Sequence, residues 1–239
     1  IVSFYSFINE NKTIINESIN DRGLFKAVFL AGQPGSGKTY VMTKITSGQI
    51  EPRIVNVDNI TEFLNIHNPL SVYDKSKKIS KNQLYNYLNG MLPLFVDSTS
   101  ANPTTLKKRL NVLESLGYDC ALIYVNTSLE KSVERVGNRK RKVGQEIIQG
   151  NYSELQTLKN EYKKYFPFRM EINNNEGALT DDVILKAYKR ISYFFDSEID
   201  NPIGNERYEM MLKNGYKYIV PDIISQNDLK SMINTWYSS

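Results

Sequence analysis

The sequence has very little of the chemistry that holds disulfides, metal clusters or membrane spans. Cys120 is the only cysteine and His67 the only histidine, so the sequence predicts neither an internal disulfide nor a zinc cluster, and a reducing, cytoplasmic compartment is the simplest expectation. No apolar run approaches the roughly 20 residues that a membrane helix needs. Residues 1–12 carry no basic segment ahead of their apolar residues. We therefore expect no signal peptide and no membrane partner.

The composition is otherwise that of a globular protein. The chain has 239 residues, of which 41% are hydrophobic and 23% charged, enough for one α/β domain with a small extension. The net charge of +4 is mild, but basic residues gather between residues 131 and 142. The abundance of Asn, Ile, Lys and Tyr suggests an AT-rich genome, such as that of a phage or an AT-rich bacterium.

Strands and helices are expected to alternate along most of the chain. Short apolar runs predict strands at residues 26–31, 53–57, 94–96, 120–125 and 168–172. Helical spacing and stop signals predict helices at residues 1–24, 37–47, 81–91, 103–116, 128–136, 144–165 and 180–195. This alternation predicts an α/β fold with a five-stranded, mainly parallel sheet and helices on both faces.

The pattern changes after Asp196. Residues 1–196 are expected to form one domain, and residues 197–239 a C-terminal extension whose role the pattern does not indicate. Within the extension, residues 197–206 resemble a linker, and residues 207–239 predict a small α/β appendage of helix, short strand and helix.

A glycine-rich motif follows the first expected strand and precedes a helix. It satisfies the pattern G-x-x-x-x-G-K-[ST] of a P-loop with Gly32, Gln33, Pro34, Gly35, Ser36, Gly37, Lys38 and Thr39. Glycines let backbone N–H groups wrap a triphosphate, while Lys38 can reach its β- and γ-oxygens and Thr39 can bind Mg²⁺. The motif therefore predicts a P-loop NTPase fold, with ATP or GTP and Mg²⁺ as cofactors and residues 26–31 as the central strand.

Two aspartates are expected at the carboxyl ends of strands, where doubly wound sheets bind ligands. Asp58 ends the second expected strand and is a candidate for the base that accepts a proton from an attacking hydroxyl; equally, it could cap the next helix. Asp97 ends the third and is a candidate for holding Mg²⁺ through water or for orienting the substrate. A polar cluster follows it, in which Thr99 and Asn102 are further substrate-binding candidates.

The basic segment contains Arg135, Arg139 and Arg141. Guanidinium groups stabilise the charge that develops during phosphoryl transfer, and a lid that carries them would also exclude water. Gly137 and Asn138 interrupt the expected helix here, which favours a lid over the alternative, a solvated run of charge.

Several of these stretches resemble the zeta-toxin and polynucleotide-kinase group of P-loop kinases over about residues 26–175. They are AGQPGSGKT, then VNVDNITEF with HNP, then LFVDSTSANPTTLKKRLNVLESLGYDCALIYVNTSLEKSVERVGNRKRK. The resemblance implies that Asp58 activates the acceptor hydroxyl, that Asp97 lies in the acceptor site, and that Arg139 is the lid arginine, with Arg135 and Arg141 as alternatives. Asn174 belongs to an N-x-E-G turn that is similar to one in zeta toxins.

One position departs from the group, which usually carries an arginine three residues after the base aspartate. Here that residue is Thr61. The sequence thus predicts a kinase that transfers the γ-phosphoryl group to an anionic acceptor, a nucleotide sugar or a polynucleotide 5′ end. The alternative is a nucleotide-binding module without catalysis, which Thr61 favours and which intact Lys38 and Asp58 oppose.

Overall fold

The computed structural model describes residues 23–46, 53–64, 69–138, 143–175, 180–214 and 224–238. Its strands are β1 (Lys26–Ala31), β2 (Arg53–Val55), β3 (Leu94–Asp97), β4 (Asp119–Asn126) and β5 (Phe168–Asn173). Its helices are α2 (Lys38–Thr46), α3 (Val57–Leu64), α4 (Pro69–Asn89), α5 (Pro103–Ser115), α6 (Leu129–Gly137), α7 (Gln145–Leu158), α8 (Tyr162–Tyr165), α9 (Asp181–Asp196), α10 (Pro202–Asn214) and α12 (Gln226–Trp236). The helix expected at the start of the chain lies on residues 1–22, outside the described part.

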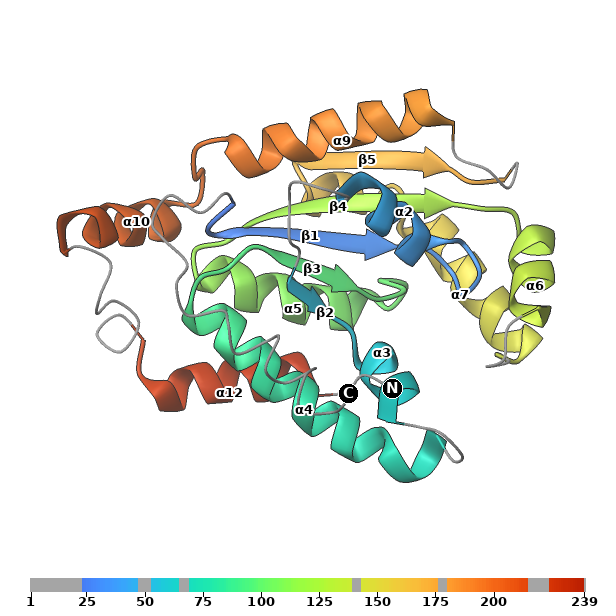
Figure 1. The fold of residues 1–239 in the computed structure, drawn as a ribbon, viewed down its shortest axis with the longest axis horizontal. Helices are drawn as coiled ribbons and strands as arrows, with labels where there is room; N and C mark the ends of the chain where they lie inside the picture. The colour runs from blue at the N-terminus through green and yellow to red at the C-terminus, as the bar shows by residue number, and fades with distance from the viewer. Residues whose placement is uncertain are drawn as a thin grey trace.

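The strands form one parallel sheet in the order β2-β3-β1-β4-β5. The central strand is β1, where Val28 lies opposite Phe95 of β3 and Ala121 of β4. All the arrows in Figure 1 point the same way, so the carboxyl ends of the strands meet at one edge of the sheet. The predicted five-stranded sheet with residues 26–31 at its centre is confirmed.

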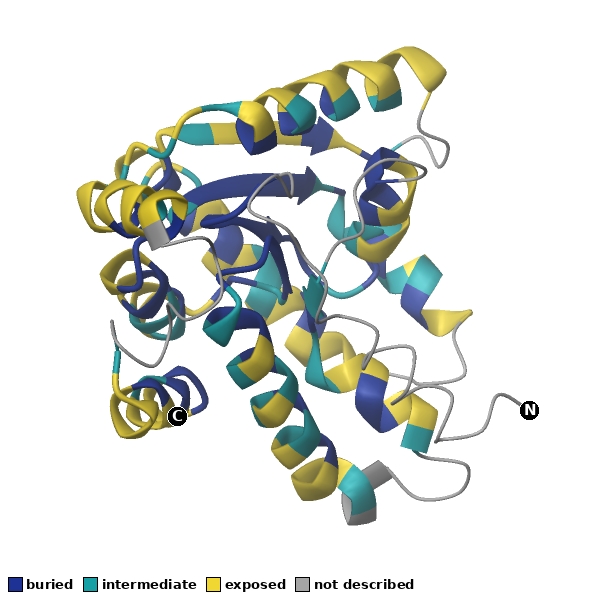
Figure 2. Cartoon of the chain, turned by 60° about the vertical axis from the view of Figure 1, so that its left-hand side comes forward, coloured by how far each residue is buried: buried dark blue, intermediate teal, exposed yellow. Residues whose placement is uncertain are grey.

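Both faces of the sheet are buried, because side chains alternate between two hydrophobic cores. In β1, Ala27, Phe29 and Ala31 join one core and Val28 and Leu30 the other. Helices α2 and α9 cover the second core, whereas α4, α5, α7 and α12 cover the first. Figure 2 shows the result as dark blue inner strands between helices whose outer sides are exposed, with the edge strand β5 partly yellow. Helices on both faces were also predicted.

Two of the expected helices have other limits. Helix α4 begins at Pro69 rather than at residue 81. Its first half was missed because it buries Ser76 and Ser80, and small polar residues on the buried face hide the helical period of apolar residues. The helix expected at residues 144–165 is divided into α7 and α8. The chain turns between them, and the buried Tyr162 then donates a hydrogen bond to the carbonyl of Ser100 at 2.8 Å.

The linker expected at residues 197–206 is wrong, because α10 begins at Pro202. Proline suits the first turn of a helix, and the side-chain oxygen of Asn201 accepts hydrogen bonds from the N–H groups of Ile203 at 3.0 Å and Gly204 at 3.4 Å. The helix lies close to the turn before β4: a Cβ on Gly204 would stand 2.0 Å from the carbonyl oxygen of Gly117.

The last described helix, α12, packs on α4 and α5 (Figure 1). Trp236 is 1% exposed, and the guanidinium of Arg109 lies 5.4 Å from the centre of its ring. The short strand expected between the two C-terminal helices falls on residues 215–223, outside the described part. Among the described helices, none combines the length and apolarity required to cross a bilayer.

Candidate nucleotide-binding site

The loop between β1 and α2 has the backbone shape of a phosphate cradle. Gly35 has φ +85° and Gly37 φ +89°, conformations that residues with a Cβ rarely adopt. A Cβ would also collide with neighbours, 2.4 Å from the carbonyl oxygen of Ser132 at Gly35 and 2.4 Å from Nδ2 of Asn174 at Gly37. Glycine is therefore required at both positions, and the curled backbone fits the close approach of phosphate oxygens.

The side chain of Gln33 holds the loop from inside the protein. It is fully buried, and its Nε2 donates to the carbonyl of Thr127 and, at 2.9 Å, to Oγ of Ser132. Ser36 is also buried, so the side chains of these two predicted nucleotide-binding residues face inward. The backbone N–H of Ser36 donates to the carbonyl of Gln33 at 3.0 Å, which closes a turn within the loop.

A second set of hydrogen bonds holds the loop from Asn174, directly after the carboxyl end of β5. Nδ2 of Asn174 donates to the carbonyl of Ser36 at 2.8 Å, and the carbonyl of Asn174 accepts a 2.9 Å hydrogen bond from Arg135. The same guanidinium lies 3.4 Å from the carbonyl oxygen of Gly35. Arg135 therefore lies against the loop, and its nucleotide role stays a prediction. Arg139 and Arg141 lie outside the described residues.

The lysine and threonine of the loop open α2. Nζ of Lys38 donates to the carbonyls of Gly32 at 2.7 Å and Gln33 at 3.3 Å, so the ammonium group lies over the loop. Oγ1 of Thr39 donates to Oδ2 of Asp97 at 3.3 Å. Asp97 is 9% exposed and ends β3, beside β1. The structure thus brings the predicted metal ligand and the predicted substrate carboxylate into contact.

Asn56 is the residue that sequence reasoning missed. Its Nδ2 donates to Oδ2 of Asp97 at 2.7 Å, and its Oδ1 accepts from the N–H groups of Asp58 at 2.7 Å and Asn59 at 3.2 Å. Asparagine is a favoured helix cap, a signal that could have identified it. Asn56 therefore links the end of β3 to the start of α3.

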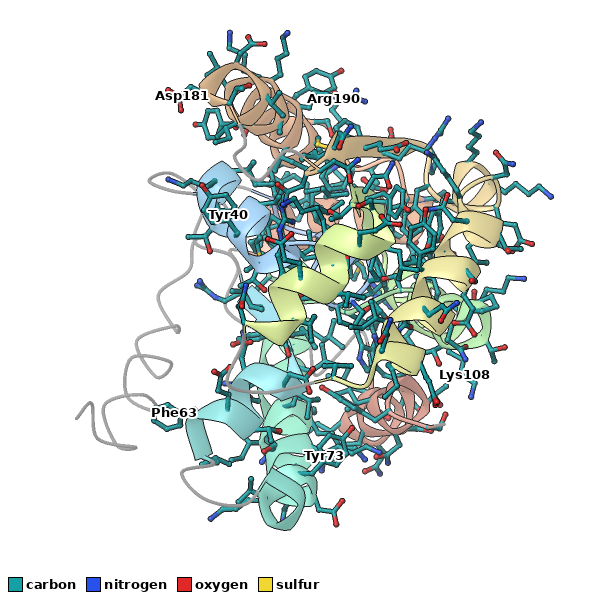
Figure 3. All side chains as sticks on the ribbon, turned by 90° about the vertical axis from the view of Figure 1, so that its right-hand side faces the viewer. Tyr40, Phe63, Tyr73, Lys108, Asp181 and Arg190 are labelled. Carbon is teal, nitrogen blue, oxygen red and sulfur yellow. The ribbon has the colours of Figure 1, made fainter. Side chains whose placement is uncertain are left out.

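The expectation that Asp58 ends a strand is wrong, and so is the alternative that it caps a helix. Strand β2 ends at Val55, and Asp58 lies in the first turn of α3, which Asn56 caps. The carboxylate is exposed at the same edge of the sheet. In Figure 3, which looks onto this edge, the exposed rings of Tyr40 on α2 and Phe63 on α3 mark where the two helices reach the surface.

The polar cluster after β3 supports the loop. The carbonyl of Thr99 accepts from the N–H of Gly32 at 3.1 Å, and Oδ1 of Asn102 accepts from the N–H of Thr105 at 2.9 Å. Asn102 therefore caps α5. It was predicted to bind the substrate, but its side-chain oxygen is already hydrogen-bonded to the helix. Thr61, at the position where the resemblance expects arginine, is 6% exposed and donates to the carbonyl of Val57 at 2.9 Å.

Together, the fold and the phosphate cradle define a nucleotide-binding protein of the P-loop kinase type. A family comparison narrows this class, because residues 12–200 match the model described as Zeta toxin. The chain therefore belongs to the zeta toxin family. No curated protein matches it at the level that counts as significant.

Two solved structures have the same fold. One comes from the PezAT chromosomal toxin-antitoxin system of the human pathogen Streptococcus pneumoniae, with 14% identity, a TM-score of 0.50, and coverage of 81% of this chain and 96% of that one. The other is the AvrRxo1-ORF1:-ORF2 complex, with 13% identity, a TM-score of 0.51, and coverage of 90% of this chain and 80% of that one. At these identities the likeness shows the fold alone.

Proposed function

We propose that the protein is a kinase that transfers the γ-phosphoryl group of ATP or GTP to a hydroxyl of an anionic acceptor, either a nucleotide sugar or a polynucleotide 5′ end. The observation that carries this proposal is a chain of contacts. Thr39 at the phosphate loop touches Asp97, and Asn56 joins Asp97 to the first turn of α3, which carries Asp58. An exposed carboxylate outside the loop thus shares an edge of the sheet with the phosphate cradle.

On the nucleotide side, Lys38 is proposed to contact the β- and γ-phosphate oxygens in place of the loop carbonyls that it now contacts. Arg135 lies beside the loop and would stabilise the charge of the transferred group. Arg139 and Arg141 are proposed to add to it from the lid. Guanidinium groups suit this role because their planar fork can grip two phosphate oxygens.

Thr39 and Asp97 fit a Mg²⁺ ion and would be the residues that hold it. A hydroxyl and a carboxylate are the hard oxygen donors that Mg²⁺ takes, directly or through water, and here they lie 3.3 Å apart. When bound, the ion would neutralise phosphate charge. The contact with Thr39 supports a role of Asp97 on the metal side of the site rather than the predicted contact with the acceptor.

On the acceptor side, Asp58 is proposed as the general base. The acceptor oxygen would form a bond to the γ-phosphorus while the bond from that phosphorus to the bridging oxygen breaks. Asp58 would take the hydroxyl proton, and the nucleoside diphosphate would leave. Thr99 remains a candidate for contacting the acceptor, because its side chain is partly exposed beside the loop.

Thr61 favours a second candidate, a nucleotide-binding module without transfer. Its side chain is buried and bonded within α3, so it does not supply the cation that the resemblance assigns to this position. In that case the site would bind the triphosphate and leave the acceptor unchanged.

The test is transfer of label from γ-labelled ATP or GTP to nucleotide sugars and to RNA and DNA with 5′-hydroxyl ends. We expect one acceptor class to be labelled by the wild type, and Lys38→Ala to lose this labelling. Lys44→Ala, on the exposed side of the same helix, is the matched control and should label like the wild type. A wild type that binds the nucleotide but labels no acceptor would replace the kinase by the binding module.

A further inference from the structure

Asn56 uses both ends of its side chain at the junction of the two halves of the site. Its amide nitrogen donates 2.7 Å to Oδ2 of Asp97, and its amide oxygen accepts from the N–H of Asp58, also at 2.7 Å. A side-chain amide donates through its nitrogen and accepts through its oxygen, so it can make both bonds at once. Serine or aspartate would cap α3 equally well, so capping alone does not explain the residue.

The position of Asn56 follows from the sheet. Strands β2 and β3 are parallel neighbours with Val55 opposite Val96, which places Asn56 at the level of Asp97. Because β2 ends there, the next residues enter α3 directly (Figure 1). The amide therefore spans from a carboxylate on the inner strand to the helix that follows the edge strand.

We propose that Asn56 is a positioning residue: its amide fixes the Thr39–Asp97 pair relative to Asp58, and so sets the distance between the phosphate side and the acceptor side of the site. The catalytic part of this inference rests on the proposed kinase function. The connection itself is a property of the fold and can be tested without activity. A displacement of about 1 Å between reacting groups can cost about 100-fold in rate.

Asn56→Asp tests the two hydrogen-bonding roles of the side chain separately, because it removes the donor to Asp97 and keeps the acceptor that caps α3. The carboxylate keeps the cap of α3 but loses the donor, and it faces the carboxylate of Asp97. We expect kcat to fall about 10- to 100-fold, with the KM for nucleotide changed less than about threefold. A residue that only supports folding would instead lower the melting temperature and leave kcat unchanged.

Asn201→Asp is the matched control, because Asn201 also caps a helix with its oxygen and donates with its nitrogen. Its Nδ2 bonds the carbonyls of Glu114 at 2.9 Å and Tyr118 at 3.3 Å, beside the amino end of β4 and therefore at the opposite edge of the sheet. This variant should lose stability but keep kcat. If both variants lower kcat equally, or neither does, Asn56 does not position the reacting groups.

A second measurement needs no turnover. Asn56→Asp combined with Asp97→Asn exchanges amide and carboxylate, and so restores a donor facing an acceptor. If the two changes were independent, the shift in melting temperature of the double variant would equal the sum of the shifts of the two single variants. We expect the double variant to melt about 2–10 °C above the temperature that this sum predicts. Strict additivity would overturn the inference whatever the activity. If the melting temperatures couple but the wild type transfers no phosphoryl group, the kinase proposal fails and the connection stands.

Discussion

Gly37→Ala should damage the protein through its loop, and the structure sets the size of the effect. The residue has φ +89°, and a new Cβ would stand 2.4 Å from Nδ2 of Asn174. The left-handed backbone costs a residue with a Cβ about 1–2 kcal/mol. Displacing Asn174 from the carbonyl of Ser36 costs about 0.5–1.5 kcal/mol more. The sum, about 1.5–3.5 kcal/mol, corresponds to a fall of about 3–14 °C in melting temperature.

Nucleotide affinity should fall in the same variant, because the loop N–H groups that we propose to contact the phosphates would move. Losing one charge-assisted hydrogen bond, about 1.5–3 kcal/mol, weakens binding about tenfold to a hundredfold. Calorimetry and titration with an ATP analogue measure both effects. Gly150→Ala is the control: it lies within α7 with nothing inside 4 Å of the added Cβ, so alanine should stabilise by about 0.5–1 kcal/mol. Equal melting and equal affinity in Gly37→Ala and the wild type would refute the reasoning.

Two further changes test the fold away from the loop. Gly204→Ala would place a Cβ 2.0 Å from the carbonyl oxygen of Gly117. The overpacking costs about 1–3 kcal/mol and should exceed the gain in helix propensity of about 1 kcal/mol, so the variant should be less stable than the wild type. A calorimetric melting temperature at or above that of the wild type would contradict the packing of α10. Burial, and then Glu171, raise the pKa of Tyr124 to about 12, above the value of about 10 in the unfolded chain. The unfolded state therefore loses this proton first, stability falls as the pH rises from about 10 to about 12, and urea unfolding of Tyr124→Phe should show a smaller fall over that range.

Much of the sheet could be predicted because its inner strands β3, β1 and β4 are buried on both faces. The runs from Ala27 to Ala31 and from Cys120 to Val125 are apolar, and each strand was found within one or two residues of its expected ends. The P-loop motif then identified the central strand. The start of α10 was mistaken for a linker, because the face that this helix buries contains Gly204, Arg207 and Met211 rather than an apolar stripe.

The connections within the site were harder to predict, because they join residues far apart in the chain. Asn174 contacts Ser36 across 138 positions, and Asn56 contacts Asp97 across 41. A single asparagine after an apolar pair has the same local pattern whether it continues the strand or caps a helix. The sequence could show that Asp58 is a candidate for the general base. It could not show that Asp58 lies in a helix, because that depends on where β2 ends.

The central claim is that Asp58 is the base of a phosphoryl transfer. It is tested most directly by measuring nucleotide binding and phosphoryl transfer separately in the Asp58→Asn variant. Asp58 lies on α3, whereas the loop contacts described above come from α2, from α6 and from the residues that follow β3, β4 and β5. The variant should therefore bind a non-hydrolysable ATP analogue with Mg²⁺ within about twofold of the wild type. Single-turnover transfer to the acceptor that the wild type labels should fall about 100- to 10,000-fold, the usual contribution of a positioned base. Transfer by Asp58→Asn at the wild-type rate would contradict the account.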